Sequence, residues 1–282
     1  MKAIVILAKL TFREAIRRRI LLAGFALGIS FLAIYSIGLH FILIQVSRVA
    51  LDSAPGQNVV NVESQNTFLM AGLYAITFLS IAMAALLGAD TLAGEINSGT
   101  IQTIATKPIR RADVVLGKWL GFASLLALYQ LLMAGGAVTS MFVQAHYVPD
   151  HLLSGLGLIY LEALIVMTIT LMCSAYFSAL ATGGIVFGLY GLAFIGGWIE
   201  QIGAVLHNST AVQIGIITSL IIPSESLWRR AAFEMQTPLA GVLGISPFGA
   251  SSVPSPLMVF YAVFYLGITL SLAIRIFQKR DL

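Results

Sequence analysis

Residues with catalytic chemistry are few in this sequence, and their spacing matches no enzyme signature. No His-Glu-x-x-His, Gly-x-Ser-x-Gly or Cys-x-x-Cys motif occurs in the 282 residues. Four histidines (His40, His146, His151, His207) are scattered, and nothing completes a metal coordination set around His146 and His151. The single cysteine, Cys173, suits a small buried hydrophobe. We expect no enzyme activity, cofactor or metal in this chain.

Gly117-Lys118 does not form a phosphate-binding loop. The position that needs the first glycine of such a loop is Ala112, and Trp119 stands where Ser or Thr is required. The chain is therefore not expected to hydrolyse ATP by itself.

Glu162 is the one acidic residue well inside an apolar run. A carboxylate in hydrocarbon is costly, so Glu162 is a candidate pathway residue, a relay or a contact with a partner. Two other interpretations stay open: a position near the outer interface, and a protonated carboxyl hydrogen-bonded between helices. Glu200, at the end of the next run, is expected to be an interfacial anchor.

The elements that position these residues are helices in lipid. With 59% hydrophobic and 10% charged residues and a mean hydropathy of +0.94, the chain cannot cover a soluble surface. We predict one all-α transmembrane domain over residues 1–282. Its six spans are expected at 20–46, 67–89, 119–143, 152–177, 185–199 and 257–277.

Residues 52–66, with Pro55-Gly56 and several Asn and Gln, predict a polar loop between the first two spans. Two further segments outside the spans have patterns of their own. Residues 2–19 predict an amphipathic helix on the membrane surface, with Lys9, Arg13 and Arg17 at a spacing of four; a simple polar tail is the alternative. Residues 200–256 predict an outer-side segment. There, 211–222 is too short to span and suits a re-entrant piece, and a helix with Ser224 as its N-cap follows. A seventh span at 201–222 is the rival interpretation.

Basic residues predict the orientation, because they stay on the cytoplasmic side of short loops. Six lie in the N-terminal segment, four at 90–118 and three at the C-terminal end, so six spans place 13 of the 16 on one side. The exceptions are Arg48, Arg229 and Arg230. Both termini and the 90–118 loop are therefore expected in the cytoplasm.

The 90–118 loop is the most specific feature of the sequence. Leu92, Ile96 and Ile104, with Thr100 between, repeat at a spacing of four and predict a helix along the cytosolic surface. Pro108 cannot continue that helix. An ordinary positively charged loop is the alternative.

The loop also resembles that of ABC-2 type exporter permeases. The similarity lies in Glu95, three residues, Gly99-Thr100, then Pro108-x-x-Arg111 and Lys118. The ending Phe277-Gln-Lys-Arg-Asp-Leu282 is also similar to that of many such subunits. Small single-domain members, such as those paired with nitrous-oxide-reductase maturation or with drug export, look most similar. Ala93-Gly94 departs from the pattern, since many members have a second acid or an Arg there.

The resemblance implies the transmembrane half of an ABC transporter. A coupling helix at 90–106 would dock on a separate cytosolic ATP-binding subunit, which would bind ATP and Mg²⁺, and 174–182 would make a smaller contact. A second permease copy, identical or paralogous, would complete the pathway in the plasma membrane of a prokaryote; no nucleic acid is expected. The implied contact residues are Asp90, Leu92, Glu95, Ile96, Gly99, Thr100, Ile104, Pro108 and Arg111.

The predicted function is ATP-driven transport, with export of an apolar or amphipathic substrate. The alternative is a secondary transporter or channel driven by an ion gradient through Glu162; an intramembrane enzyme lacks a visible nucleophile–base pair. Aromatic residues of the spans could line a pathway or face lipid: Phe31, Tyr35, Phe78, Phe187 and Tyr190.

Overall fold

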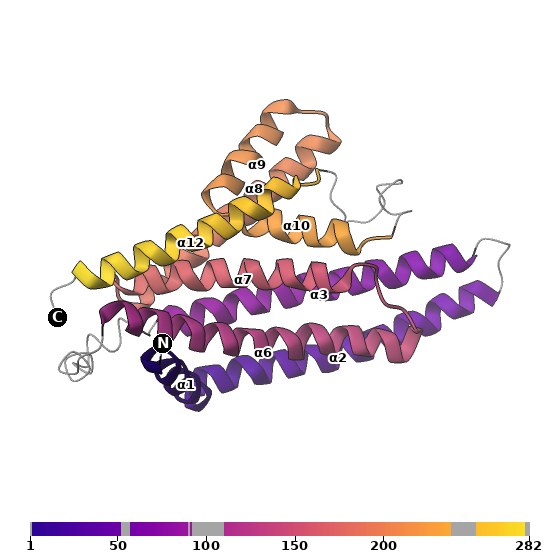
Figure 1. Cartoon of the computed structure of the whole chain (residues 1–282). Helices are drawn as coiled ribbons and strands as arrows, with labels where there is room; N and C mark the ends of the chain where they lie inside the picture. The colour runs from indigo at the N-terminus through magenta and orange to yellow at the C-terminus, as the bar shows by residue number, and fades with distance from the viewer. Residues whose placement is uncertain (1, 52–56, 90, 92–109, 238–251, 280–282) are drawn as a thin grey trace.

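The protein is an assembly of helices in every part of the chain that the structure describes. The computed structural model describes residues 2–51, 57–89, 91, 110–237 and 252–279. In chain order the helices are α1 (Lys2–Arg17), α2 (Arg19–Leu51), α3 (Gln57–Ala89), α6 (Arg111–Ala145), α7 (Leu152–Ser174), α8 (Ala179–Val205), α9 (Ser209–Ile221), α10 (Ser224–Met235) and α12 (Pro256–Lys279) (Figure 1). No strand occurs in these ranges, and the predicted all-α class is confirmed.

Six of the described helices are long and apolar enough to cross a bilayer: α2, α3, α6, α7, α8 and α12. The six predicted spans are confirmed. The short helices α9 and α10 are bent by 107° relative to each other, as in a re-entrant hairpin. They would add a seventh span only if the two together are taken as a single broken span. The apolar run predicted at 211–222 forms most of α9.

Two local predictions outside the spans are wrong. The polar stretch predicted as a loop at 52–66 is helical from Gln57 onward, because no Pro or Gly interrupts it after Gly56. At 33 residues, α3 is about 50 Å long and exceeds the roughly 30 Å of hydrocarbon. The N-cap of α10 is Pro223 instead of Ser224, and no side chain caps this end. Proline suits a helix start, because its missing N–H has no partner there in any case.

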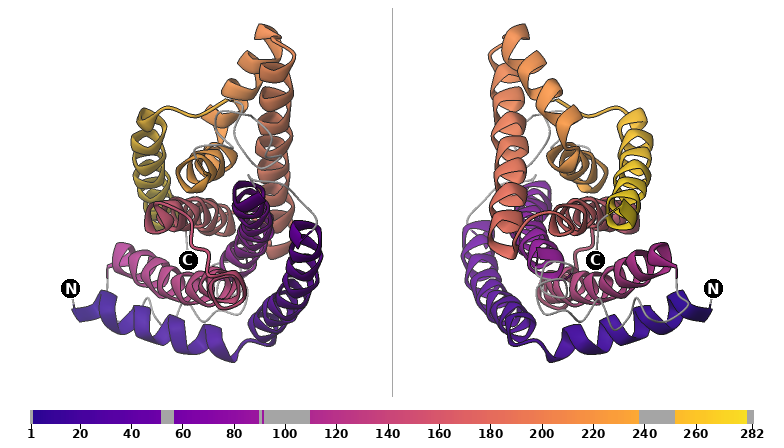
Figure 2. Two further views of the ribbon diagram at one scale, coloured as in Figure 1. Left: turned by 90° about the vertical axis from the view of Figure 1, so that its right-hand side faces the viewer. Right: turned by 90° about the vertical axis from the view of Figure 1, so that its left-hand side faces the viewer.

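Helix α1 lies across the end of the bundle against α6 (Figure 2). The crossing is close because α6 presents glycine there. A Cβ on Gly117 would lie 2.5 Å from Cβ of Leu7, and one on Gly121 would lie 2.7 Å from the carbonyl oxygen of Ala8. Gly117-x-x-x-Gly121 is therefore a small-residue docking site for α1, a type of contact on which helix packing in membranes depends.

Helix α7 occupies the centre of the bundle, in contact with α3, α6, α8, α10 and α12. Its middle is fully buried at Ile165, Val166 and Met167. Hydrogen bonds also hold the central helices together: Trp119 Nε1–H of α6 donates to Oγ1 of Thr168 at 2.8 Å. In lipid such bonds and close packing stabilise helix association, since the apolar side chains gain little by leaving lipid for protein.

Helices α8 and α9 form a close hairpin that projects beyond the other helices (Figures 1 and 2). Glycine allows the contact: a Cβ on Gly196 would lie 1.9 Å from Oγ1 of Thr218, and one on Gly203 would lie 2.6 Å from Cβ of Ala211. The first half of α8 differs, because a Cβ on Gly184 or Gly188 would meet nothing within 4 Å. The glycines of α8 thus serve internal packing in its second half only.

Candidate functional site

The predicted coupling helix at 90–106 lies outside the residues that the structure describes, except for Thr91. Eight of the residues implied to contact a partner fall there: Asp90, Leu92, Glu95, Ile96, Gly99, Thr100, Ile104 and Pro108. Their roles stay predictions. What the structure describes is the platform from which this segment departs and to which it returns.

This platform consists of the end of α3, the start of α6 and the end of α12, which lie together. Thr91, which follows α3, is buried and donates from its hydroxyl to the carbonyl oxygen of Leu87 at 2.6 Å. Arg111, the last implied contact residue, donates from Nη1 to the carbonyl oxygen of Gln278 at 3.0 Å. Both flanks of the segment, together with α1 and the last turn of α12, therefore lie at one end of the bundle (Figure 1).

A separate apolar cluster stiffens this end. It consists of Val114 and Val115 of α6, Leu171 of α7, Ala175, and Ala273 and Phe277 of α12. Phe277 is 2% exposed, so the C-terminal helix is anchored in the platform. Force on the start of α6 would consequently reach α7 and α12 through packed side chains.

The turn between α7 and α8 belongs to the predicted second contact, 174–182. Ser178 is the N-cap of α8, and its hydroxyl oxygen accepts the N–H of Ala181 at 3.4 Å. Tyr176 is 64% exposed and Leu180 90% exposed. The turn thus presents large apolar side chains that the described part of the chain does not cover.

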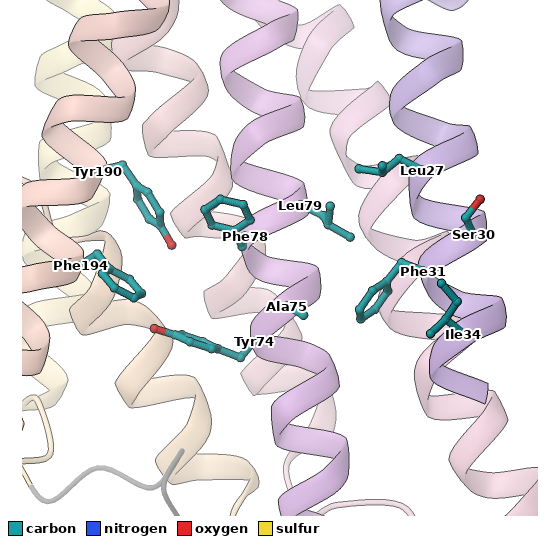
Figure 3. A pocket seen from close by; sticks show the side chains of 10 residues that line it. All are labelled: Leu27, Ser30, Phe31, Ile34, Tyr74, Ala75, Phe78, Leu79, Tyr190 and Phe194. Atoms are coloured by element: carbon teal, nitrogen blue, oxygen red, sulfur yellow. The ribbon is translucent and has the colours of Figure 1, made fainter. Parts of the chain in front are cut away.

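A mostly apolar cavity of about 480 Å³ opens between α2, α3 and α8. Figure 3 shows aromatic side chains from all three helices around it. The lining residues are Leu27, Ser30, Phe31, Ile34, Tyr74, Ala75, Phe78, Leu79, Tyr190 and Phe194. We call this cavity the aromatic pocket. Its size and composition suit an apolar or amphipathic small molecule.

Three of the five predicted pathway aromatics line the aromatic pocket, namely Phe31, Phe78 and Tyr190. Tyr35 is buried instead, stacked between Phe31 and Phe68 with centroids 6.1 and 5.2 Å away. Phe187 is 40% exposed and does not line the pocket. The spacing of aromatic residues along one helix could not distinguish pocket-lining from buried or exposed side chains, because the difference depends on which neighbouring helix covers each face.

Glu162 lies in the middle of α7 and is fully buried, so the interpretation as an outer-interface residue is wrong. Neither carboxyl oxygen has a hydrogen-bond partner among the described residues. Glu225 of α10 and two residues of the aromatic pocket, Tyr74 and Tyr190, are close enough to interact with it electrostatically. A buried acid without a partner is costly, and at this site it lies behind the wall of the pocket.

Sequence reasoning missed a buried ion pair between α8 and α10. Glu200, predicted as an interfacial anchor, is 4% exposed and pairs with Arg229, which is 1% exposed. The contact is bidentate, with Nη1 2.6 Å from Oε1 and Nη2 2.8 Å from Oε2, and Ser252 donates to Oε1 at 2.7 Å. The sequence feature that could have revealed it is an acidic and a basic residue, Glu200 and Arg229, each in apolar surroundings, because a buried charge is costly unless an opposite charge pairs with it.

Three histidines hold unusual backbone at helix ends. His146, His151 and His207 have φ near +50°, at 51°, 50° and 54°. His146 is the C-cap of α6, and its N–H bonds the carbonyl oxygen of Phe142 at 2.9 Å. At His146 and His207 this left-handed conformation ends a helix, whereas His151 precedes the first residue of α7. The three histidines therefore have a structural role in the chain path.

Comparison with known proteins supports what this arrangement suggests. A family model described as "ABC-2 family transporter protein" matches residues 5–282, nearly the whole chain. The chain belongs to the ABC-2 transporter family. It is also similar to the "Probable ABC transporter permease protein NosY" of Pseudomonas aeruginosa, with 35% identity over 79 residues. That match covers 28% of this chain and 29% of the relative.

Membership of the ABC-2 family gives the architecture a function class. The protein is a multi-pass membrane protein, a permease of the ABC-2 transporter family. Two described features can be set against this family membership: the platform beside the 90–110 segment, and the aromatic pocket.

Proposed function

We propose that the chain is the membrane-spanning permease subunit of an ATP-driven exporter for an apolar or amphipathic substrate. The 90–106 segment couples it to a separate cytosolic subunit that binds ATP and Mg²⁺. The observation that carries this proposal is the ABC-2 family match over residues 5–282. The packed platform supports it, because movement imposed on the start of α6 would be passed on to α7 and α12.

The substrate class follows from the aromatic pocket. Its wall is aromatic and aliphatic, with the polar groups of Ser30, Tyr74 and Tyr190 among them. Such a surface gains free energy by covering apolar area, at roughly 25 cal/mol per Å². A strongly hydrophilic substrate would find few hydrogen-bond partners there.

A second permease copy is proposed to complete the pathway. Apolar side chains remain exposed along α2 and α8, among them Ile34 at 71% and Ile195 at 58%. These two helices also border the aromatic pocket, so a second copy against them would enclose it. Identical and paralogous copies would serve this role equally well.

The orientation and location belong to the same proposal. The placement of 13 of 16 basic residues supports cytoplasmic termini and a cytoplasmic 90–118 loop in the plasma membrane of a prokaryote. Two of the three exceptions are neutralised in the structure, because Arg229 pairs with Glu200 and Arg230 pairs with Glu234 at 3.0 Å. A paired arginine places a weaker constraint on orientation.

The coupling assignment is tested by replacing Glu95 with Gln or Gly99-Thr100 with bulkier residues. We expect transport and co-purification of the ATP-binding subunit to fall at least about tenfold, the equivalent of about 1.4 kcal/mol. Asp113→Asn, in the first turn of α6 and beyond Pro108, is the matched control and should change little. Normal export and normal co-purification of the Glu95→Gln protein would show that the coupling assignment is wrong.

The buried Glu162 favours one alternative, an ion-gradient-driven transporter or channel. This function would persist in vesicles that lack any ATP-binding subunit and would be lost in Glu162→Gln, which keeps the shape but removes the ionisable group. Transport that depends on ATP and survives Glu162→Gln would exclude this alternative.

A further inference from the structure

Buried acidic residues outnumber buried basic ones behind the aromatic pocket. The buried charged side chains of the described chain are Lys118, Glu162, Glu200, Glu225 and Arg229. Lys118 belongs to the α1–α6 crossing at the end of the bundle, where its neighbours Gly117 and Gly121 contact α1. Arg229 is therefore the one described base among three acids, and it already forms an ion pair with Glu200.

Glu225 is placed against the pocket by the packing of α10. Its side chain lies on α8, since a Cβ on Gly197 would lie 2.2 Å from Cγ of Glu225. Trp228, nearly one turn further along α10, packs on Tyr74 with 4.8 Å between ring centroids. Tyr74 lines the aromatic pocket, so α10 and its acidic residue lie directly behind the pocket wall.

Glu162 brings a second carboxyl group to the same place. It interacts electrostatically with Glu225, and with Tyr74 and Tyr190 of the pocket wall. It is fully buried, and neither of its carboxyl oxygens has a hydrogen-bond partner among the described residues. A carboxylate in such a position is costly unless an opposite charge lies nearby. A positive charge in the pocket would reduce this cost, and no residue that lines the pocket supplies one.

The wall of the pocket is itself suited to a cation. Its aromatic residues are Phe31, Tyr74, Phe78, Tyr190 and Phe194, and Figure 3 shows them on three helices around the cavity. The face of an aromatic ring attracts a cation within about 6 Å. Leu27 and Ile34 of the lining lie in the middle of the span Arg19–Gln45, at a depth where lipid tails offer a cation no such attraction.

We propose that the aromatic pocket binds an amphipathic organic cation. The positive charge lies against the aromatic faces on the side of Glu162 and Glu225, and the apolar body extends toward α2. This inference rests on the proposed transport function and names its substrate class. An anion of the same shape would face the buried carboxyl groups with a like charge, and a neutral compound would gain only from burial of apolar area.

Two ions of the same shape and opposite charge test the site. Equilibrium dialysis would compare tetraphenylphosphonium with tetraphenylborate on the full chain in detergent, with any ATP-binding subunit that co-purifies and with protein-free micelles as the blank. We expect saturable binding of the phosphonium, at least about tenfold tighter than that of the borate. Equal affinities, or tighter binding of the borate, would overturn the proposal.

Charge removal gives a second readout. Glu162→Gln keeps the size of the side chain and should weaken phosphonium binding about tenfold without weakening borate binding. Glu14→Gln removes the same charge from an exposed position on α1 and should change neither affinity. Phosphonium binding that is unchanged in Glu162→Gln, or that falls equally in Glu14→Gln, would contradict the proposal.

A pair of exposed phenylalanines tests the aromatic faces without changing the protein interior. Phe78 lines the pocket and is 53% exposed, so Phe78→Leu removes one aromatic face and should weaken phosphonium binding several-fold. Phe142 of α6 is 51% exposed and does not line the pocket, and Phe142→Leu is the matched control. The same affinity in both variants would count against the site.

The binding assay needs no ATP, so it separates this inference from the proposed export. ATP-dependent export of the neutral dye Nile red, in a protein that fails to bind the phosphonium, would overturn the cation site and leave the proposed function intact. The expected pattern of phosphonium binding in a protein that exports nothing would support the site and contradict the proposed function.

Discussion

Individual side chains in the interior of this permease show how charge is managed in an apolar environment. Glu200 and Arg229 form an ion pair with two short contacts, of which the one from Nη2 to Oε2 is a hydrogen bond, and Ser252 donates a further hydrogen bond to Glu200. Gly215 makes room for them, since a Cβ there would lie 2.2 Å from Cβ of Glu200. Glu162, only one helix away, has no such partner among the described residues. The paired residues stabilise the contact between α8 and α10, and a role of Glu162 in transport stays a proposal.

Removing one member of the buried ion pair should destabilise the protein. Arg229→Ala leaves the Glu200 carboxylate buried without its counter-charge, and we expect a loss of about 3–5 kcal/mol in stability. Thermal unfolding of the purified protein in detergent would measure it. Glu14→Ala, which breaks the exposed Glu14–Arg18 pair, is the control and should cost about 0–1 kcal/mol. Equal effects of the two variants would contradict this account.

The crossing of α1 over α6 determines where the N-terminal helix lies, and two glycines permit it. Leu7 and Ala8 approach α6 so closely that a methyl group cannot fit at Gly117 or Gly121 without a shift. Lys118, between them, is only 5% exposed. Gly117 of the Gly-Lys pair that looks like a fragment of a phosphate loop is in fact part of a helix–helix contact.

A matched pair of glycine variants tests this contact. Gly121→Ala places a methyl group 2.7 Å from the Ala8 carbonyl oxygen, and we expect a loss of about 1–3 kcal/mol from overpacking. Gly135→Ala, in the same helix, meets nothing within 4 Å and should be neutral or gain up to about 1 kcal/mol, because alanine is the better helix former. Unfolding temperatures in detergent would compare them. The same stability in both variants would refute a tight α1–α6 crossing.

At the scale of the whole molecule, the two ends of the bundle differ in character. One end gathers α1, the flanks of 90–110 and the last turn of α12 over a packed platform. The other carries the α6–α7 connection and the bent α9–α10 pair. The aromatic pocket lies on the side of the bundle, between α2, α3 and α8 (Figure 3). This division suits a subunit that receives a signal at one end and changes a pathway in the membrane.

Single cysteines on either side of α6 would determine the orientation. In a Cys173→Ala background, Asp150→Cys should react with a membrane-impermeant maleimide added to intact cells, and Arg110→Cys should react only after the cells are opened. Both positions are exposed, and the 35 residues of α6 separate them. We expect this labelling because basic residues are concentrated at the end of the bundle that contains Arg110, and such residues stay on the cytoplasmic side. The reverse labelling pattern would overturn the proposed topology.

The sequence by itself determined the lipid environment and the six spans, because bilayer thickness sets the length and the apolar composition of a span. It also indicated the family, through the residues of the 90–118 loop. It could not determine which faces meet. In lipid, a side that packs on protein and a side that faces acyl chains are both apolar, so Tyr35 and Phe78 look alike until their neighbours are known. Tertiary structure alone decided that Glu200 pairs with Arg229, that Gly117 and Gly121 receive α1, and that Glu162 lies at the centre. Each depends on residues distant in the chain that meet only when the helices pack.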